Sequence, residues 1–275
     1  MRAPKSGLRH RAAVLAVLCA VLVAGYVWSP SASRLAPLSS ASIASALASD
    51  STVPSGSVAP SSTPATTTYV VVIDAGHQAK ADLKTEPIGP GSKTRRARVE
   101  GGATGVSTHR PESLDNLQIA LKLQSDLEKR GVKVIMVRTK QNVDIPNSKR
   151  AKIANDAHAD LFIRLHCDSS SSSSVRGVLM LVPASNTWTR KIVKPSARAG
   201  RDVLAAVLKT THAKNRGTTK RGDLSGFNWS KVPTALVEMG LMSNRAEDRE
   251  LASAAYQSKL ASGTAAGIMA FLSGK

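Results

Sequence analysis

The sequence predicts a three-layer α/β sandwich, in which helices flank a mostly parallel, twisted sheet. From residue 69 onward, short β-branched apolar runs alternate with longer segments whose apolar residues recur at helical spacing. Strands that are joined through helices pair in parallel, and the helices then cover the faces of the sheet. The hydrophobic share of 42% is ordinary for a domain with a sizeable core.

Residues 1–29 are predicted to be an export segment. A basic stretch from Arg2 to Arg11 precedes an uncharged apolar run from Ala12 to Trp28. The run is long for a signal-peptide core and short for a membrane span, so a cleaved signal peptide and a retained membrane anchor both stay open. The basic flank predicts that the downstream chain crosses the membrane. We therefore expect an exported, extracytoplasmic protein, either secreted or anchored.

Residues 30–68 are predicted to be a disordered linker. Ser, Thr, Pro, Ala and Val dominate this stretch, and Arg34 and Asp50 are its only charges. Such a composition cannot bury enough apolar surface to fold, so it would act as a flexible tether. The folded domain is expected to occupy residues 69–275.

The elements of this domain are expected in alternating order. Short β-branched runs predict strands at 69–73, 132–137, 161–165, 177–182 and 234–237. Helical periodicity predicts helices at 113–130, 148–157, 198–208, 246–254 and 258–272.

One helix and one loop carry further expectations. In helix 148–157, Ile153 and Ala154 are expected to face inward, whereas Lys149, Arg150 and Lys152 are expected to face solvent. Segment 78–110 is basic and lacks apolar periodicity, so it is interpreted as a long loop.

Three predicted strands end at or near a residue that can bind a metal or move a proton: His77, His166 and Glu238. Ligands of parallel sheets bind at the carboxyl ends of the strands, where these residues would converge. Glu112 begins the first long helix and should lie at the same edge. Two histidines and a carboxylate form a typical catalytic zinc site, and a second carboxylate can move protons.

Each of these residues also has a simpler explanation. A histidine after a strand is usually a loop or core residue, and the helix dipole alone favours Glu112 at a helix start. Glu238 is harder to explain, because it lies in an apolar run and a buried charge needs a partner. The remaining histidines do not end apolar strands and are assigned no role: His10, His109, His158 and His212.

Two neighbours of the candidate site carry weaker expectations. Asp74 could orient a histidine through its second ring nitrogen, or it could cap the backbone. Cys167 should point away from the site, because it directly follows His166 on a strand. The only other cysteine, Cys19, is distant in the sequence, so no disulfide framework is expected.

Four segments resemble, in order, the motifs of the zinc-dependent N-acetylmuramoyl-L-alanine amidases. They are Val-Val-Ile-Asp-Ala-Gly-His77, the helix start at Glu112 with Asn-Leu-Gln-Ile-Ala, Leu-Phe-Ile-Arg-Leu-His166, and Ala-Leu-Val-Glu238-Met-Gly. The resemblance covers about residues 69–272. The sequence departs from the common pattern at Ala75, at Gln78 and at Cys167 with Asp168, but no candidate ligand is lost.

This resemblance implies the roles of the residues. His77, Glu112 and His166 would hold one Zn²⁺ per chain, and Glu238 would be the catalytic acid and base. The enzyme would hydrolyse the amide between the lactyl group of N-acetylmuramic acid and the L-alanine of the stem peptide, during cell wall turnover or remodelling. Segment 78–110 lies between two of the implied ligands, so it would be a substrate-binding or lid loop; a solvated charged loop is the equally weighted alternative.

The charge of the chain predicts polyanionic partners. From residue 69 onward, 33 Lys and Arg face 18 Asp and Glu, a net charge of +15. Charge alone does not separate nucleic acid from anionic wall polymers. The export segment and the absence of a recognised nucleic-acid motif favour peptidoglycan and anionic cell wall polymers, with no nucleic acid. A monomer is expected. The alternatives are an inactive amidase-like protein that binds wall or regulates a partner, and a zinc peptidase that cleaves crosslinks.

Overall fold

The computed structural model describes residues 69–274. The predicted export segment and linker, residues 1–29 and 30–68, lie outside this range. Within it, no helix has both the length and the apolar character that a membrane span requires.

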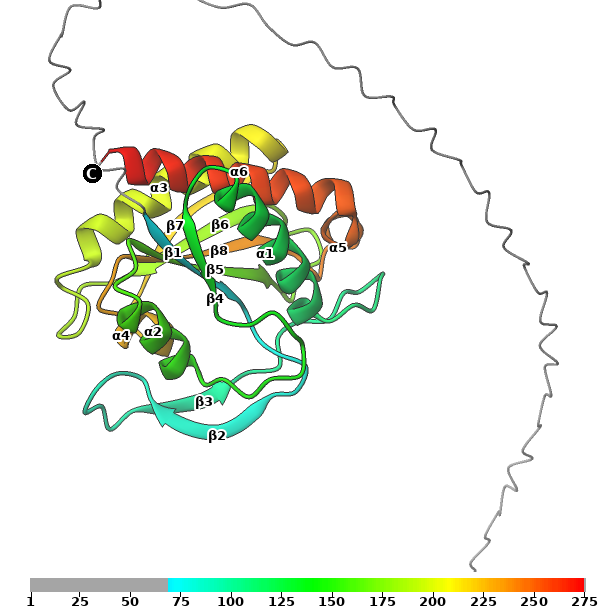
Figure 1. Cartoon of the computed structure of the whole chain (residues 1–275). Coiled ribbons are helices and arrows are strands. Elements are labelled where there is room, and N and C mark those ends of the chain that lie inside the picture. The colour runs from blue at the N-terminus through cyan, green and yellow to red at the C-terminus, as the bar shows by residue number, and fades with distance from the viewer. Residues whose placement is uncertain (1–68, 275) are drawn as a thin grey trace, which may run out of the picture. The chain divides into compact units, whose positions relative to one another are not determined.

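A six-stranded sheet forms the centre of the domain, in the order β4-β1-β5-β8-β6-β7 (Figure 1). All neighbouring pairs are parallel except β6 with β8. The predicted fold class is therefore confirmed. The strands are β1 (Val70–Ala75), β4 (Lys133–Met136), β5 (Leu161–Asp168), β6 (Val178–Pro183), β7 (Asn215–Arg221) and β8 (Thr234–Leu241).

Helices cover both faces of this sheet (Figure 1). One face carries α1 (Glu112–Glu128), α3 (Val193–Thr211) and α6 (Ala254–Ser273), and the other carries α2 (Asn147–Asp156) and α4 (Ser225–Asn228). The short helix α5 (Arg245–Ala252) follows β8 and contacts α6.

The alternation of β1 explains the three layers. Val71 and Ile73 belong to the large core beneath α1, α3 and α6, whereas Val72 belongs to the smaller core beside α2. Successive side chains of a strand point to opposite faces of the sheet. Val71, Val72 and Ile73 are nevertheless all fully buried. A continuous apolar run is therefore required, because both faces of β1 are covered.

Helix α1 begins where the sequence predicted. Glu112 and Asp115 lie in its first turn, where carboxylates interact favourably with the helix dipole. Gly131, with φ of 79°, follows its end, in the left-handed conformation that commonly stops helices. The start of α1 lies beside the end of β1, because Arg138 Nη2 donates to the carbonyls of both Gly76 and Ser113.

The prediction of an unstructured loop at 78–110 was wrong. Within it, β2 (Asp82–Pro87) and β3 (Arg95–Val99) form an antiparallel pair. Most of their side chains are exposed or half-buried, so neither strand shows the alternation of apolar residues that reveals strands in a sequence. Both oxygens of Glu86 accept hydrogen bonds from Ser148 at the start of α2, which attaches the pair to the domain.

Strands β5 and β8 are longer than predicted. His166 and Glu238 do not follow their strands but lie within them, paired with each other in the parallel register. The register continues, with a shift, to Asp168 and Leu241. Strand β7 and helix α4 were not predicted at all, because Asn215–Arg221 is polar and Ser225–Asn228 spans only four residues.

Candidate active site

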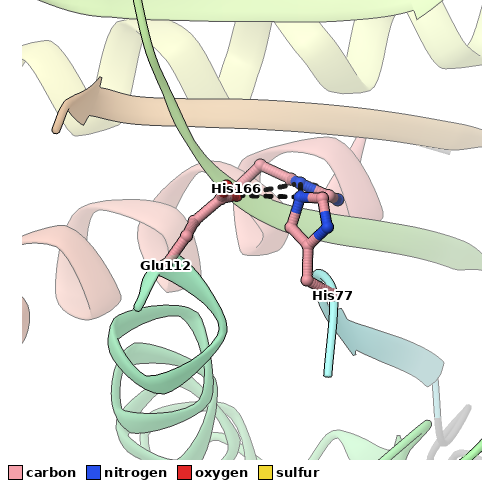
Figure 2. Close-up of side chains that lie close together, drawn as sticks. All are labelled: His77, Glu112 and His166. Carbon is pink, nitrogen blue, oxygen red and sulfur yellow. Dashed lines mark hydrogen bonds and ion pairs between the residues drawn. The ribbon is translucent and has the colours of Figure 1, made fainter. Parts of the chain in front are cut away.

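The three predicted ligands come together, although they lie far apart in the sequence (Figure 2). Glu112 Oε1 lies 3.3 Å from His77 Nε2 and 3.2 Å from His166 Nδ1. The two ring nitrogens are themselves 3.2 Å apart. One atom from each residue lies within 4.8 Å of the others, so this group can hold a metal ion.

Glycines allow these side chains to approach each other. A Cβ at Gly76 would collide with the ring of His166, so only glycine fits between β1 and His77. Gly102, with φ of 80°, packs against the site, and a Cβ there would lie 2.9 Å from Glu112 Oε2. His77 has a φ of 58°, a left-handed conformation that non-glycine residues adopt rarely and that occurs at functional sites.

A backbone carbonyl fixes the tautomer of His77. Its Nδ1 lies 2.7 Å from the carbonyl oxygen of Glu100. A carbonyl oxygen only accepts hydrogen bonds, so Nδ1 carries the hydrogen and Nε2 presents its lone pair to the other ligands. Sequence reasoning missed this contact, because a backbone oxygen leaves no signature in the sequence.

Hydrogen bonds also hold Glu112 in place. Its Oε2 accepts from the amide of Ala103 at 2.8 Å, and its Oε1 accepts from the amide of Cys167 at 3.0 Å and from Asn116 Nδ2 at 3.1 Å. The Cys167 thiol is buried and lies 3.4 Å from Asn116 Oδ1, on the α1 side of the sheet, as expected. These hydrogen bonds orient the carboxylate towards the two histidines.

The electrostatics suit metal binding. Burial lowers the pKa of His166 to about 4, so its ring is neutral near pH 7. Burial opposes the charge of Glu112, yet the close ring nitrogens of His166 and His77 hold its pKa well below the usual range. For His77, burial acts to lower the pKa, but the hydrogen bond and charge of Glu112 raise it. A neutral imidazole and an ionised carboxylate are the forms that bind metals.

Glu238 lies beside this group, on β8 opposite His166. It lines the same pocket as His77 and His166, which has a volume of about 340 Å³. Burial raises its pKa well above the usual value, and the carboxylates of Glu112 and Asp168 raise it further. Glu238 Oε2 and His166 Nε2 are buried and have no hydrogen-bond partner among residues 69–274. Orphaned polar atoms of this kind indicate a site that a ligand completes.

Asp74 does not orient a histidine. It is fully buried, and its oxygens accept from Arg150 Nη1 at 2.7 Å and Arg164 Nε at 2.9 Å. Burial would raise the pKa of Asp74, but the two guanidinium groups hold it far below its usual range. The acid is therefore the counter-ion of two buried arginines, a role that neither sequence interpretation of Asp74 anticipated.

The prediction that Arg150 faces solvent was wrong. The residue is 1% exposed, and its guanidinium also donates to the carbonyls of Ala75 and His77. Arg138 supports the same turn through the carbonyls of Ala75 and Gly76. A signal was present, because Arg150 precedes the inward Ala154 by four residues on α2 and so shares its face.

Segment 78–110 borders the candidate site. Arg96, Ala97, Val99 and Glu100, on and after β3, line the pocket that contains the two histidines and Glu238. Among the described residues, the other histidines do not belong to this group: His109, His158 and His212. His212 ends α3 in a left-handed conformation, with φ of 57°, and its amide donates to Leu208.

A mostly parallel α/β domain that gathers two histidines and two glutamates at one edge of its sheet has the organisation of a metal-dependent hydrolase. The chain belongs to the N-acetylmuramoyl-L-alanine amidase family, whose model matches residues 71–270. The resemblance found in the sequence is thereby confirmed, and the protein is a peptidoglycan amidase.

Individual relatives agree with this assignment. The chain is 29% identical over 218 residues to N-acetylmuramoyl-L-alanine amidase Rv3717 of Mycobacterium tuberculosis, a match that covers 77% of this chain and 90% of the relative. It is 27% identical to the amidase AmiC of Escherichia coli, but spans only 50% of that protein.

Solved structures share the fold. The amidase Ami1 from Mycobacterium smegmatis superposes with a TM-score of 0.67 at 24% identity, covering 75% of this chain and 98% of that one. The catalytic domain of CwlV, an amidase from Paenibacillus polymyxa, gives a TM-score of 0.60 at 26% identity, covering 75% and 99%.

Proposed function

We propose that this amidase holds one zinc ion through His77 Nε2, Glu112 Oε1 and His166 Nδ1, with Glu238 as its general base and acid. The observation that carries the proposal is the convergence of these three atoms within 4.8 Å, beside a buried carboxyl that has an orphaned oxygen. The family is typically zinc-dependent, and the donor set fits, because two nitrogens and one oxygen leave a fourth position open. When bound, zinc supplies Lewis-acid chemistry, namely a polarised carbonyl and a more acidic water.

The protein groups then have distinct tasks. Glu238 accepts a proton from the attacking water and returns it to the nitrogen of L-alanine as the amide breaks. Its raised pKa suits a group that must both take and release a proton near neutral pH. The carbonyl of Glu100 holds the His77 tautomer, and the Ala103 and Cys167 amides hold Glu112.

The bond cleaved is the amide between the lactyl group of N-acetylmuramic acid and the L-alanine of the stem peptide. Peptidoglycan lies outside the cytoplasmic membrane, which accords with an extracytoplasmic role and with the export segment predicted at 1–29. The inactive-homologue alternative receives no support, since all four proposed residues are present and close together.

Metal analysis tests the zinc site. The purified full chain should contain about one zinc ion, lose activity in excess chelator and regain it when zinc is added. Glu112→Gln should lower zinc affinity and activity together, whereas Glu128→Gln, at the far end of α1, should change neither. Undiminished activity in chelator, with no metal detected, would reject the site.

We further propose that anionic wall polymers bind a basic surface on α3 and β7. Between Arg190 and Arg221 the chain carries ten Lys and Arg but one acidic residue, Asp202. Four of these cations surround a shallow groove of about 540 Å³, and we call this set the α3–β7 basic surface: Lys194, Arg198, Arg201 and Lys220. Such a concentration of charge attracts phosphate polymers over long range.

A further inference from the structure

Two pockets of opposite charge meet at the candidate active site. The first, the cationic pocket of about 340 Å³, contains Arg96, Arg164 and Arg221. The second, the acidic pocket of about 510 Å³, contains Glu112 and Asp168 but no lysine or arginine. Both pockets share the residues at the centre of the site: His77, Glu100, His166 and Glu238. A substrate that spans the centre therefore meets a different charge on each side.

Arg164 is a built feature of the cationic pocket. It is 4% exposed, and two of its nitrogens are already used: Nε donates to Asp74 at 2.9 Å and Nη2 to Asn147 at 2.6 Å. The third nitrogen, Nη1, makes no hydrogen bond within residues 69–274. It lies against Gly226 of the same pocket, where a Cβ would collide with it. The side chain is thus fixed, with one donor group still available in the pocket.

The charge around Arg164 is not balanced. One carboxylate, Asp74, serves both Arg150 and Arg164, so two buried guanidinium groups share a single negative charge. A buried charge without a full partner is unfavourable, and an anion in the pocket would relieve it. At the rim, Arg96 and Arg221 already have acidic partners, because both pair with Asp223 and Arg96 also pairs with Glu100, so the excess positive charge lies at Arg164. The pocket therefore favours a negatively charged group.

The position of Arg164 sets the distance from the reacting bond. Arg164 precedes His166 by two residues on β5, so both side chains leave the same face of the sheet, about 7 Å apart along the strand. An anion held by Arg164 would lie roughly one residue away from a bond held at His166. This spacing suits a carboxylate close to the scissile amide.

The two sides of the substrate differ in the same way as the two pockets. On the glycan side, the lactyl and acetamido groups next to the amide are uncharged. On the peptide side, L-alanine is followed by D-glutamate, which is linked through its side chain and so leaves an α-carboxyl group that is either free or amidated. We propose that the cationic pocket receives the stem peptide and that Arg164 binds this α-carboxylate. This inference rests on the proposed amidase function. Arg164 then makes the enzyme selective for peptides that are not amidated at this position.

Two matched muropeptides test the inference. They differ only in a carboxylate or a carboxamide at the α-position of the second residue. With the zinc-loaded full chain, kcat/KM should favour the carboxylate by about 10- to 100-fold, the range expected for a charged hydrogen bond. Arg164→Gln should bring the ratio close to one, and Arg164→Lys should leave an intermediate ratio. Arg130→Gln, an exposed change beyond α1, should keep the original ratio.

Binding without turnover gives a second readout. In chelator, calorimetry should show that the full chain binds the free L-alanyl-γ-D-glutamate dipeptide more tightly than its α-amide, and that Arg164→Gln removes the difference. If the unaltered protein hydrolyses both muropeptides equally, or prefers the amide, the inference is overturned even if Arg164→Gln does not fold. Hydrolysis of neither muropeptide, together with no release of L-alanine peptides from whole peptidoglycan, would instead reject the proposed function and the inference with it.

Discussion

Glu238 and His166 occupy paired positions on the neighbouring strands β8 and β5, and each has one buried side-chain atom without a hydrogen-bond partner in the described residues. The register between β5 and β8 therefore places the two residues next to each other, and no flexible loop is involved in positioning them. Groups on adjacent strands of a packed sheet keep their separation, as a pre-organised site requires. The two residues nevertheless have opposite pKa shifts, because burial disfavours a charge on either one.

Replacing Glu238 by Gln tests its role as a proton carrier. Glutamine keeps the shape of the side chain but cannot titrate, so activity should fall by at least about 10²- to 10⁴-fold, while the zinc content stays at one per chain. Zinc analysis, thermal unfolding and peptidoglycan hydrolysis should be measured on the same preparation. A folded, zinc-loaded variant that works at the original rate would exclude Glu238 as the base.

The pH profile should report the same group. Burial raises the pKa of Glu238, and a general base must be deprotonated, so kcat/KM should rise with pH through this raised pKa. The rise should lie well above the ordinary glutamate pKa of 4.5. The residual activity of Glu238→Gln should lack this rise. Loss of activity only near pH 4 would contradict the assignment.

Removing the charge of Asp74 should destabilise the fold. Asp74→Asn leaves the buried guanidinium groups of Arg150 and Arg164 without a counter-ion, which should lower the free energy of unfolding by about 3–5 kcal/mol. Urea unfolding measures this change. Asp156→Asn breaks an exposed ion pair with Lys152 and should change the free energy by less than about 1 kcal/mol. Equal effects of the two substitutions would count against the buried pairing.

The same residue predicts a pH dependence of stability. The pKa of Asp74 is lowered in the folded state, so its stabilisation is fully present above the unfolded pKa, which is close to 4. The stabilisation should decline as the pH falls from there towards the folded value. In Asp74→Asn, this part of the acid-induced loss should be missing when unfolding is repeated at several pH values.

The α3–β7 basic surface should bind walls through screened charge. Changing Lys194, Arg201 and Lys220 to Gln should weaken sedimentation with purified walls and flatten its dependence on salt. Changing Lys129, Arg130 and Lys133, three exposed cations elsewhere, removes the same charge and should have a smaller effect. Walls stripped of phosphate polymers should bind less. Binding that does not respond to salt would point to an uncharged glycan contact instead.

The strands and the residues they carry could be predicted from the sequence where local pattern and burial agree. Runs such as Val70–Ile73 are buried on both faces, so their apolar character is visible without the fold. The edge at which His77, His166 and Glu238 meet then follows from parallel topology. Glu112 could be placed because it begins a helix at that edge.

The remaining features depend on contacts that no local pattern records. The β2–β3 pair is largely exposed, so its residues do not alternate in polarity. Arg150 was placed in solvent because arginine usually lies there, whereas its partner Asp74 is 76 residues away in the sequence. The contact that fixes the His77 tautomer is made by the backbone carbonyl of Glu100, so the identity of the side chain at position 100 does not predict it.

Digestion of purified peptidoglycan, with mass spectrometry of the released fragments, tests the central claim most directly. The zinc-loaded protein should release intact stem peptides that begin with a free L-alanine amine, and it should leave glycan strands whose lactyl groups end in carboxylates. Fragments that arise from cleavage within the peptides or between the sugars, with the lactyl–alanine amide intact, would contradict the account.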